Sequence, residues 1–259
     1  MTEQEQVEAL YACQATTDVE RELADSHPAR VEPYRDRASH VVDLYEVVLE
    51  TGRLTYFKPV NAYQNAATPL KRALRNYSQT PVSALIAECA AWQLAKQLAD
   101  PWAEMIAPTV LRSVRLPDGS RDVGSLSLFR PGEPGRRAYL QAVPEQAEAG
   151  AFFDVLIGQQ DRNRGNVLWH TTRQQIHLID HGFSFARPGD NTGTLELSLW
   201  RWLHGSRELT DGERAAAGGV VDANLHGLAD YVEPDRTDAL RERARRLRND
   251  EEILQPGAL

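Results

Sequence analysis

The pattern of apolar and polar positions predicts a β-rich first half of the chain. Residues 40–60 hold two apolar runs on either side of Glu50-Thr-Gly-Arg53, which is typical of two strands joined by a tight turn. Pro81 precedes a run with apolar side chains at helical spacing, and this favours a helix over 82–99. Further strands are expected at 109–114 and 123–129, and an acidic amphipathic helix at 4–24.

The second half of the chain has a mostly helical pattern. The segment Arg130-Pro-Gly-Glu-Pro-Gly-Arg136 concentrates prolines and glycines and is the best candidate for a hinge. The elements expected after it are an apolar helix at 145–158, a hairpin within 161–185, and helices near 195–204, 211–230 and 235–248. The chain is therefore predicted to be an α+β protein with two lobes, residues 1–130 and 131–259.

Composition excludes several classes of protein. The formal net charge of -8 argues against a nucleic-acid-binding protein, because binding to a phosphate backbone requires a basic surface. The arginine-rich run 241–248 is interpreted as the solvated face of a helix. No apolar run reaches the roughly 18 residues of a membrane span, so no stable membrane insertion and a cytoplasmic location are expected. Cys89 lies on an apolar helix face, where a buried free thiol is expected.

Lys58 is the first candidate functional residue, because it is one of three lysines and lies within an apolar strand. A strand lysine can neutralise the phosphates of a nucleotide if an acidic side chain holds it in place. Glu88 is the only acidic residue between positions 51 and 99, and it lies in the middle of the helix that follows this strand. The sequence therefore predicts an ion pair between Lys58 and Glu88.

A second group of candidates follows the apolar helix at 145–158. Asp161 and Asn166 are five positions apart, as are the Asp and Asn of the kinase catalytic loop. The strand Ile176–Ile179 then ends in Asp180-His-Gly182, and a hard divalent cation favours such a carboxylate. These residues in this order indicate a phosphoryl-transfer site. Zinc is disfavoured, because the nearby histidines lack the spacing of zinc ligands.

These motifs resemble the phosphatidylinositol 3/4-kinase-like and HipA-like branches of the protein-kinase-like superfamily. The resemblance extends over roughly residues 38–190. It implies a two-lobed fold, with a β-rich N-lobe that has one key helix and a mostly helical C-lobe. It also implies that ATP is bound with Mg²⁺ or Mn²⁺.

The resemblance also implies a role for each candidate residue. Lys58 would contact the nucleotide phosphates and take part in catalysis, and Glu88 would hold Lys58. Asp161 would be the catalytic carboxylate, while Asn166 and Asp180 would bind the metal ion. No glycine-rich loop precedes the first strand, so Ser39 and backbone amides are the expected substitute for that loop.

The most favoured function is transfer of the γ-phosphoryl group of ATP to a hydroxyl of a protein or of a soluble small molecule. One alternative is transfer of a nucleotidyl (AMP) group by the same residues. Another is a nucleotide-binding pseudokinase or scaffold. A lipid kinase is less favoured, because the acidic chain shows no aromatic and basic stretch beside the metal motif.

Overall fold

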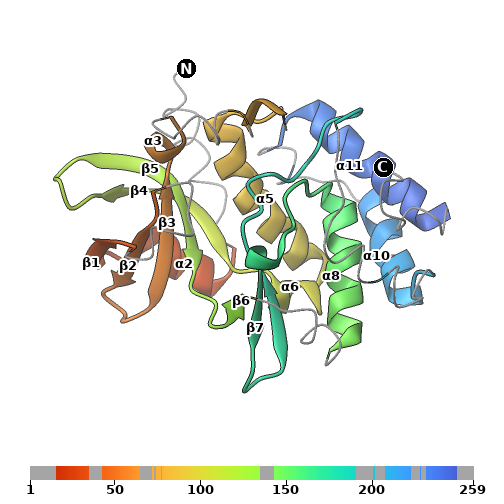
Figure 1. Ribbon diagram of the computed structural model, residues 1–259, viewed down its shortest axis with the longest axis horizontal. Coiled ribbons are helices and arrows are strands. Elements are labelled where there is room, and N and C mark those ends of the chain that lie inside the picture. Colours follow the sequence, from red (N-terminus) through yellow and green to blue (C-terminus); the bar gives the residue numbers. More distant parts are fainter. Residues whose placement is uncertain are drawn as a thin grey trace. The chain divides into compact units, whose positions relative to one another are not determined.

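The computed structural model has mixed α and β structure arranged in two compact units (Figure 1). The residues that it describes are 16–34, 43–64, 72, 74–76, 78–134, 143–190, 201, 208–222, 228 and 232–249. Unit 1 comprises Met1–Cys89 and Pro108–Phe129, and unit 2 comprises Ala90–Ala107 and Arg130–Leu259.

This division differs from the predicted boundary at position 130 in one segment. Residues 90–107 belong to unit 2, because their side chains and backbone bond to later parts of that unit. Trp102 donates its indole N–H to the carbonyl of Ala149 at 2.9 Å, and Ile106 forms a parallel bridge with Leu178. The additional boundary between Cys89 and Ala90 falls within α5 (Pro81–Leu98), where no change of composition marks it.

Unit 1 is built on a five-stranded antiparallel sheet in the order β1-β2-β3-β5-β4. The strands are β1 (Pro28–Pro33), β2 (Tyr45–Leu49), β3 (Leu54–Pro59), β4 (Thr109–Arg115) and β5 (Arg121–Leu128). The described part of this unit includes the helices α2 (Asp18–Asp25) and α3 (Val60–Gln64), and α5 (Pro81–Leu98) begins in it.

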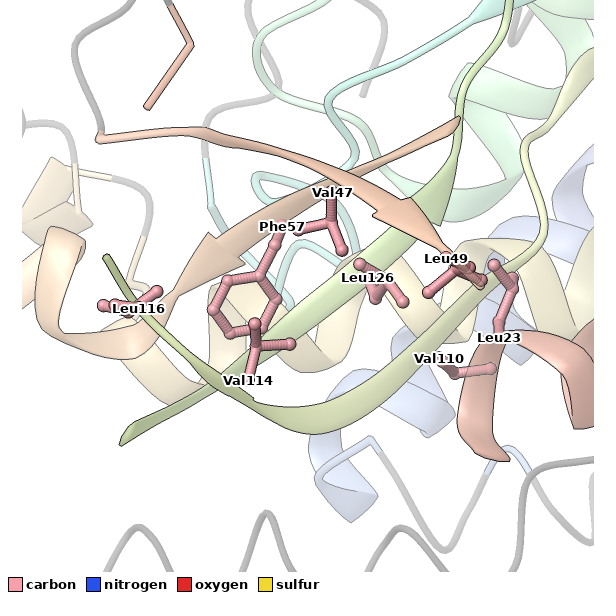
Figure 2. Close-up of a cluster of buried hydrophobic side chains, with 8 residues drawn as sticks. All are labelled: Leu23, Val47, Leu49, Phe57, Val110, Val114, Leu116 and Leu126. Atoms are coloured by element: carbon pink, nitrogen blue, oxygen red, sulfur yellow. The ribbon is translucent and has the colours of Figure 1, made fainter. Parts of the chain in front are cut away.

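One face of this sheet forms the core of unit 1 with α2. The cluster consists of Leu23, Val47, Leu49, Phe57, Val110, Val114, Leu116 and Leu126, all buried (Figure 2). Thr17 starts α2 with a capping box, in which its hydroxyl accepts from the backbone N–H of Glu20 and the Glu20 carboxylate accepts from the backbone N–H of Thr17. Gly124 lets β5 approach β3, because a Cβ atom there would lie 2.1 Å from the Lys58 carbonyl oxygen.

Unit 2 combines helices with a three-stranded antiparallel sheet in the order β6-β7-β8. The strands are β6 (Glu133–Pro134), β7 (Val167–His170) and β8 (Gln175–Leu178). The helices are α6 (Trp102–Met105), α8 (Pro144–Ile157), the 3₁₀ turn η1 (Arg164–Asn166), α10 (Asp211–Asp222) and α11 (Pro234–Asn249). No helix in these described ranges is long and apolar enough to cross a membrane.

Most of the elements expected from periodicity are present. Strand β1 was not predicted, because its prolines hide the strand pattern, although an edge strand tolerates them. The short helices α3 and α6 were also not predicted. Cys89 is buried and free, as predicted, and burial raises the pKa of its thiol. Apart from Arg201, the expected helix at 195–204 lies outside the described residues, as do residues 4–15 of the expected 4–24 helix. That helix is not continuous as predicted, because Thr17 has an extended backbone and caps α2, which begins at Asp18.

Candidate functional site

In unit 1, Lys58 and Glu88 form the ion pair that the sequence predicted. The Lys58 Nζ atom donates to Glu88 Oε1 at 2.6 Å. The alternating burial of β3 turns Lys58 to the sheet face opposite the core residue Phe57. The Glu88 side chain is only 6% exposed and that of Lys58 22%, so the amine is held by a buried carboxylate while it retains some contact with solvent.

The sheet face around Lys58 carries polar and aromatic side chains. Ser125 lies directly opposite Lys58 on β5, and Ser127 lies opposite Tyr56, so all four share this face. The Tyr56 ring packs edge to face on Phe129, with centroids 5.6 Å apart. Hydroxyls and half-buried rings replace the aliphatic side chains of the other face, so this face suits a polar planar ligand.

In unit 2, the loop that follows α8 is organised around Asp161 and Asn166. The side-chain amide of Asn166 donates to the Asp161 carbonyl at 2.9 Å, which closes the five-residue spacing seen in the sequence. Asn163 caps the turn η1, because its Oδ1 accepts from the backbone N–H of Gly165 at 2.8 Å. Since the amide nitrogen of Asn166 is used in this way, Oδ1 is the atom left for a metal ion.

Arg162 joins this loop to the strand that leads to Asp180. Its guanidinium makes a bidentate ion pair with Asp154 of α8, at 2.9–3.1 Å, and both side chains are 0% exposed. The Nη1 atom of Arg162 also donates to the carbonyls of Asn166 at 2.8 Å and Ile179 at 2.6 Å. One buried side chain thus fixes the backbone beside both predicted metal ligands.

Asp180 adopts a left-handed backbone conformation, with φ of 61°. A residue other than glycine adopts this region at a cost of about 1 kcal/mol or more, so the surrounding structure must hold it there. Gln159 contributes, because its side-chain amide donates to the Asp180 carbonyl at 3.2 Å and its Oε1 accepts from the Asp161 N–H at 3.0 Å. The two predicted functional aspartates are therefore linked through one glutamine.

The donor atoms of this site fit a hard divalent cation. Among the described residues, no three His, Cys, Asp or Glu side chains come together in the way that an all-protein metal site requires. An Asp and an Asn supply only oxygen ligands, and Mg²⁺ is commonly bound by one or two carboxylates together with phosphates and water. Asn166 and Asp180 would therefore hold a metal ion that is also bound to a nucleotide.

The remaining sequence candidates take varied positions. His181 is buried and packs edge to face on Phe153, with centroids 6.2 Å apart. Ser39 lies outside the described residues, as does Lys71, so their predicted roles stay predictions. Arg72 and Arg75 are exposed.

The structure also corrects the interpretation of the arginine-rich helix. Arg243 was assigned to a solvated face, but it is 7% exposed, and burial lowers its pKa to about 10. Its guanidinium donates to the carbonyls of Leu156 at 3.0 Å and Ala186 at 2.9 Å. Arg236, also buried, donates to the Phe185 carbonyl at 2.7 Å. Helix α11 therefore holds the segment that follows the metal motif.

Sequence reasoning missed these supporting residues, although weak signals were present. Asp154 is the only charged residue within the otherwise apolar run 149–157. Arg243 follows Arg236 by two helical turns, and Ala239, Leu240, Ala244 and Leu247 of the same helix are all buried. Gly158 faces the Arg243 guanidinium, since a Cβ atom there would lie 2.7 Å from Cζ, and its φ of +60° also favours glycine.

Known proteins show the fold but not the family of this chain. No protein-family model matches it, and no curated protein does. The crystal structure of the Golgi casein kinase with Mn and ADP bound matches at a TM-score of 0.56 and 15% identity, over 96% of this chain and 80% of that chain. A second structure of the Golgi casein kinase matches at a TM-score of 0.56 and 14% identity, with the same coverage.

A third match is the Helicobacter pylori proinflammatory kinase CtkA, at a TM-score of 0.40 and 11% identity, over 88% of this chain and 94% of that chain. The likeness to the two Golgi casein kinase structures establishes a protein-kinase-like fold, as predicted. Neither structure is described as a HipA-like or phosphatidylinositol kinase, so the branch stays a prediction.

The first prediction concerns the buried pair of Asp154 and Arg162. Asp154→Ala should lower the unfolding free energy of unit 2 by about 3–5 kcal/mol, because it leaves a buried guanidinium without its carboxylate. Asp238→Ala is the control, since that side chain is 76% exposed and its change should have little effect. Urea denaturation measures both variants. Equal stability of the two would show that Arg162 does not depend on Asp154.

The second prediction concerns His177, which is 2% exposed. Burial, assisted by the charge of Arg130, lowers its pKa from 6.5 to about 4. Between these values the unfolded state binds a proton that the folded state does not, so stability is full above pH 6.5 and falls toward pH 4. His177 should account for about 2 kcal/mol of the loss between pH 7.5 and pH 5.

Urea denaturation at the two pH values, compared between wild type and His177→Gln, isolates this contribution. The variant should lose less stability on acidification than the wild type. An identical loss in both proteins would mean that His177 titrates normally.

Proposed function

We propose that this chain is an ATP-dependent phosphotransferase that transfers the γ-phosphoryl group to a hydroxyl of a protein or of a soluble small molecule. The observation that carries the proposal is the buried Arg162, which bonds both to the loop of Asp161 and Asn166 and to Ile179, the residue before Asp180. A structure of the Golgi casein kinase, whose fold this chain shares, contains Mn and ADP, which supports the use of a nucleotide and a divalent metal ion.

Phosphoryl transfer requires mainly positioning and charge neutralisation by the protein. Lys58, held by Glu88, neutralises charge on the nucleotide phosphates. Asp161 accepts a hydrogen bond from the acceptor hydroxyl and orients its oxygen for attack. Asn166 and Asp180 would supply oxygen ligands to Mg²⁺ or Mn²⁺, and a bound metal ion would neutralise phosphate charge. Asp154, Arg162 and Gln159 act through these residues by fixing the backbone that carries them.

A protein or soluble small-molecule acceptor is favoured over a membrane lipid. A lipid kinase docks on an anionic surface, where each interfacial cation contributes about 1 kcal/mol. Arg187 is the only cation between His181 and Trp200, and it pairs with Glu233 and Asp235 of the same unit. This stretch therefore offers little charge to a membrane surface.

Two alternatives make different predictions from the same site. Transfer of an AMP group would use the same metal-binding and phosphate-binding residues with the nucleotide reversed. A pseudokinase would bind the nucleotide without transfer. The intact set of Lys58, Asp161, Asn166 and Asp180 favours an active enzyme over the pseudokinase.

The third prediction concerns binding. ATP with Mg²⁺ should raise the melting temperature of the wild type, because a ligand that binds only the folded state stabilises it. Asp180→Ala and Asp180→Asn should both remove most of the magnesium-dependent part of this shift. Asn tolerates the left-handed backbone better than Ala, so Asp180→Asn shows the effect of losing the metal-binding carboxylate without added backbone strain. An unchanged Mg²⁺-dependent shift in Asp180→Asn would refute the metal assignment.

The fourth prediction concerns transfer. Lys58→Met and Asp161→Asn should each reduce ATP hydrolysis and autophosphorylation by at least about 10², because each removes an electrostatic or positioning contribution of that size. Glu88→Gln should reduce them less, because it only loosens the placement of Lys58. Lys96→Met is the matched control for the lysine and should retain the wild-type rate within about twofold.

ATP labelled at the γ or at the α phosphate separates the enzymatic alternatives. Label from the γ position in the product supports phosphoryl transfer, and label from the α position supports nucleotidyl transfer. Nucleotide binding without any transfer would support the pseudokinase. Labelled lipid as the main product on phosphoinositide vesicles would contradict the proposed acceptor class.

A further inference from the structure

The two edge strands of the unit 1 sheet border the same groove. Strands β1 and β4 are the outer strands of this sheet (Figure 1). A cavity of about 540 Å³ is lined by Val31 of β1, by Ser113 and Arg115 of β4, by Asp25 at the end of α2 and by His27. A groove bordered by strand edges is suited to an extended chain, because its backbone can bond to theirs.

The backbone of β4 presents hydrogen-bonding groups to this outer edge. The N–H of Leu116 donates to Ser120 at 2.8 Å, and the carbonyl of Pro108 accepts from Leu128 at 2.9 Å, so the even-numbered residues of this stretch face β5. Successive residues of a strand point their backbone groups in opposite directions. Ser113 and Arg115 therefore point their N–H and C=O groups outward.

No backbone partner for these outward groups is found among the described residues. The Ser113 hydroxyl is buried and also has no hydrogen-bond partner. A buried polar atom without a partner costs free energy, so a ligand that bonds to it gains affinity. The stretch from Ser113 to Arg115 thus offers backbone N–H groups, backbone carbonyls and the Ser113 hydroxyl to a ligand.

The two edge strands differ in how well they are protected from pairing with a further strand. Strand β1 begins with Pro28 and ends with Pro33, and prolines commonly protect an edge from further pairing. Strand β4 contains no proline over its seven residues. The edge that remains open to pairing is therefore that of β4.

The positive charge of the groove favours an acidic partner. Its lining includes three arginines against one aspartate, in a chain whose net charge is -8. Arg112 already donates to the carbonyls of Leu23 at 2.6 Å and Ser26 at 2.9 Å, at the end of α2. Arg115 and Arg121 are exposed and lie directly opposite each other in the strand register. Like charges in that position repel, and a bound anion relieves the repulsion.

We propose that the outer edge of β4 binds an extended, acidic segment of a partner protein, which adds to the sheet as a further strand. Backbone hydrogen bonds to Ser113 and Arg115 supply affinity without regard to sequence. The side chains of Arg115 and Arg121 supply the preference for carboxylates. This surface belongs to unit 1 alone and is independent of the proposed transfer reaction.

The experiment uses the full chain and a fluorescein-labelled peptide of five Glu-Val repeats. Binding is measured by fluorescence anisotropy, and hydrogen exchange is measured with and without the peptide. The peptide should bind and should slow exchange of the Ser113 and Arg115 amides, which are open in the free protein. The Arg112 and Val114 amides, which face β5, should be protected in both states. No binding at 1 mM peptide, or no slowing at Ser113 and Arg115, would overturn the proposal.

Two control peptides separate strand addition from charge attraction. A Glu-Val peptide that is N-methylated at every residue keeps its charge but loses its backbone donors on both edges, and it should bind at least about tenfold more weakly. A Lys-Val peptide should not bind. Equal binding of the methylated peptide would show that the groove attracts anions without forming a strand.

Matched variants locate the site. Arg115→Glu and Arg121→Glu should each weaken Glu-Val binding at least about fivefold, whereas Arg245→Glu, an exposed arginine of α11, should leave it unchanged. Ser113→Pro removes an outward N–H and leaves the bonds to β5, so it should also weaken binding. Equal effects of Arg115→Glu and Arg245→Glu would place the peptide elsewhere.

Discussion

The candidate site in unit 2 depends on the buried ion pair between Arg162 and Asp154. Two ions without solvent exposure are tolerated only when their geometry is good and their remaining donors are used. The bidentate pair satisfies the first condition, and the carbonyls of Asn166 and Ile179 satisfy the second. Burial nevertheless raises the pKa of Asp154, so the contacts of Arg162 with the loop and with Ile179 offset only part of the desolvation cost of the pair.

Around this pair, unit 2 fixes the segment after Asp180 from several sides. The backbone N–H of Phe185 donates to Ile157 of α8 at 2.6 Å, and the N–H of Gln160 donates to Phe183 at 2.8 Å. The buried arginines of α11 occupy the carbonyls of the same segment. Hydrogen bonds from backbone N–H groups and from the arginines of α11 therefore maintain the conformation of this segment. None of these bonds depends on a chemical modification of residues 180–187.

The sequence predicted the ion pair for which it offered a single candidate partner, and it missed the pairs whose partners depend on the fold. Lys58 and Glu88 could be paired because no other acidic residue lies in that stretch. Asp154 and Arg162 could not, because a single charge in an apolar helix has no partner until α8 and the loop are packed together. Strand β1 was missed because edge strands accept prolines that periodicity treats as breaks. Arg243 was misassigned because the arginines around it are on the solvated side of α11.

The hydrogen bonds from Arg243 to Leu156 and Ala186 also set an order of events during synthesis on the ribosome. These bonds join residues separated by 87 and 57 positions in the chain. The carbonyls at the end of α8 and after the metal motif are synthesised first. Their hydrogen-bond donor, the Arg243 guanidinium, is translated later. A nascent chain that has emerged only as far as Asp190 contains every residue proposed to bind metal or orient the acceptor, but lacks the helix whose arginines bond to Leu156, Phe185 and Ala186. We therefore expect the end of α8 and residues 185–186 to be fully anchored only after α11 has been synthesised.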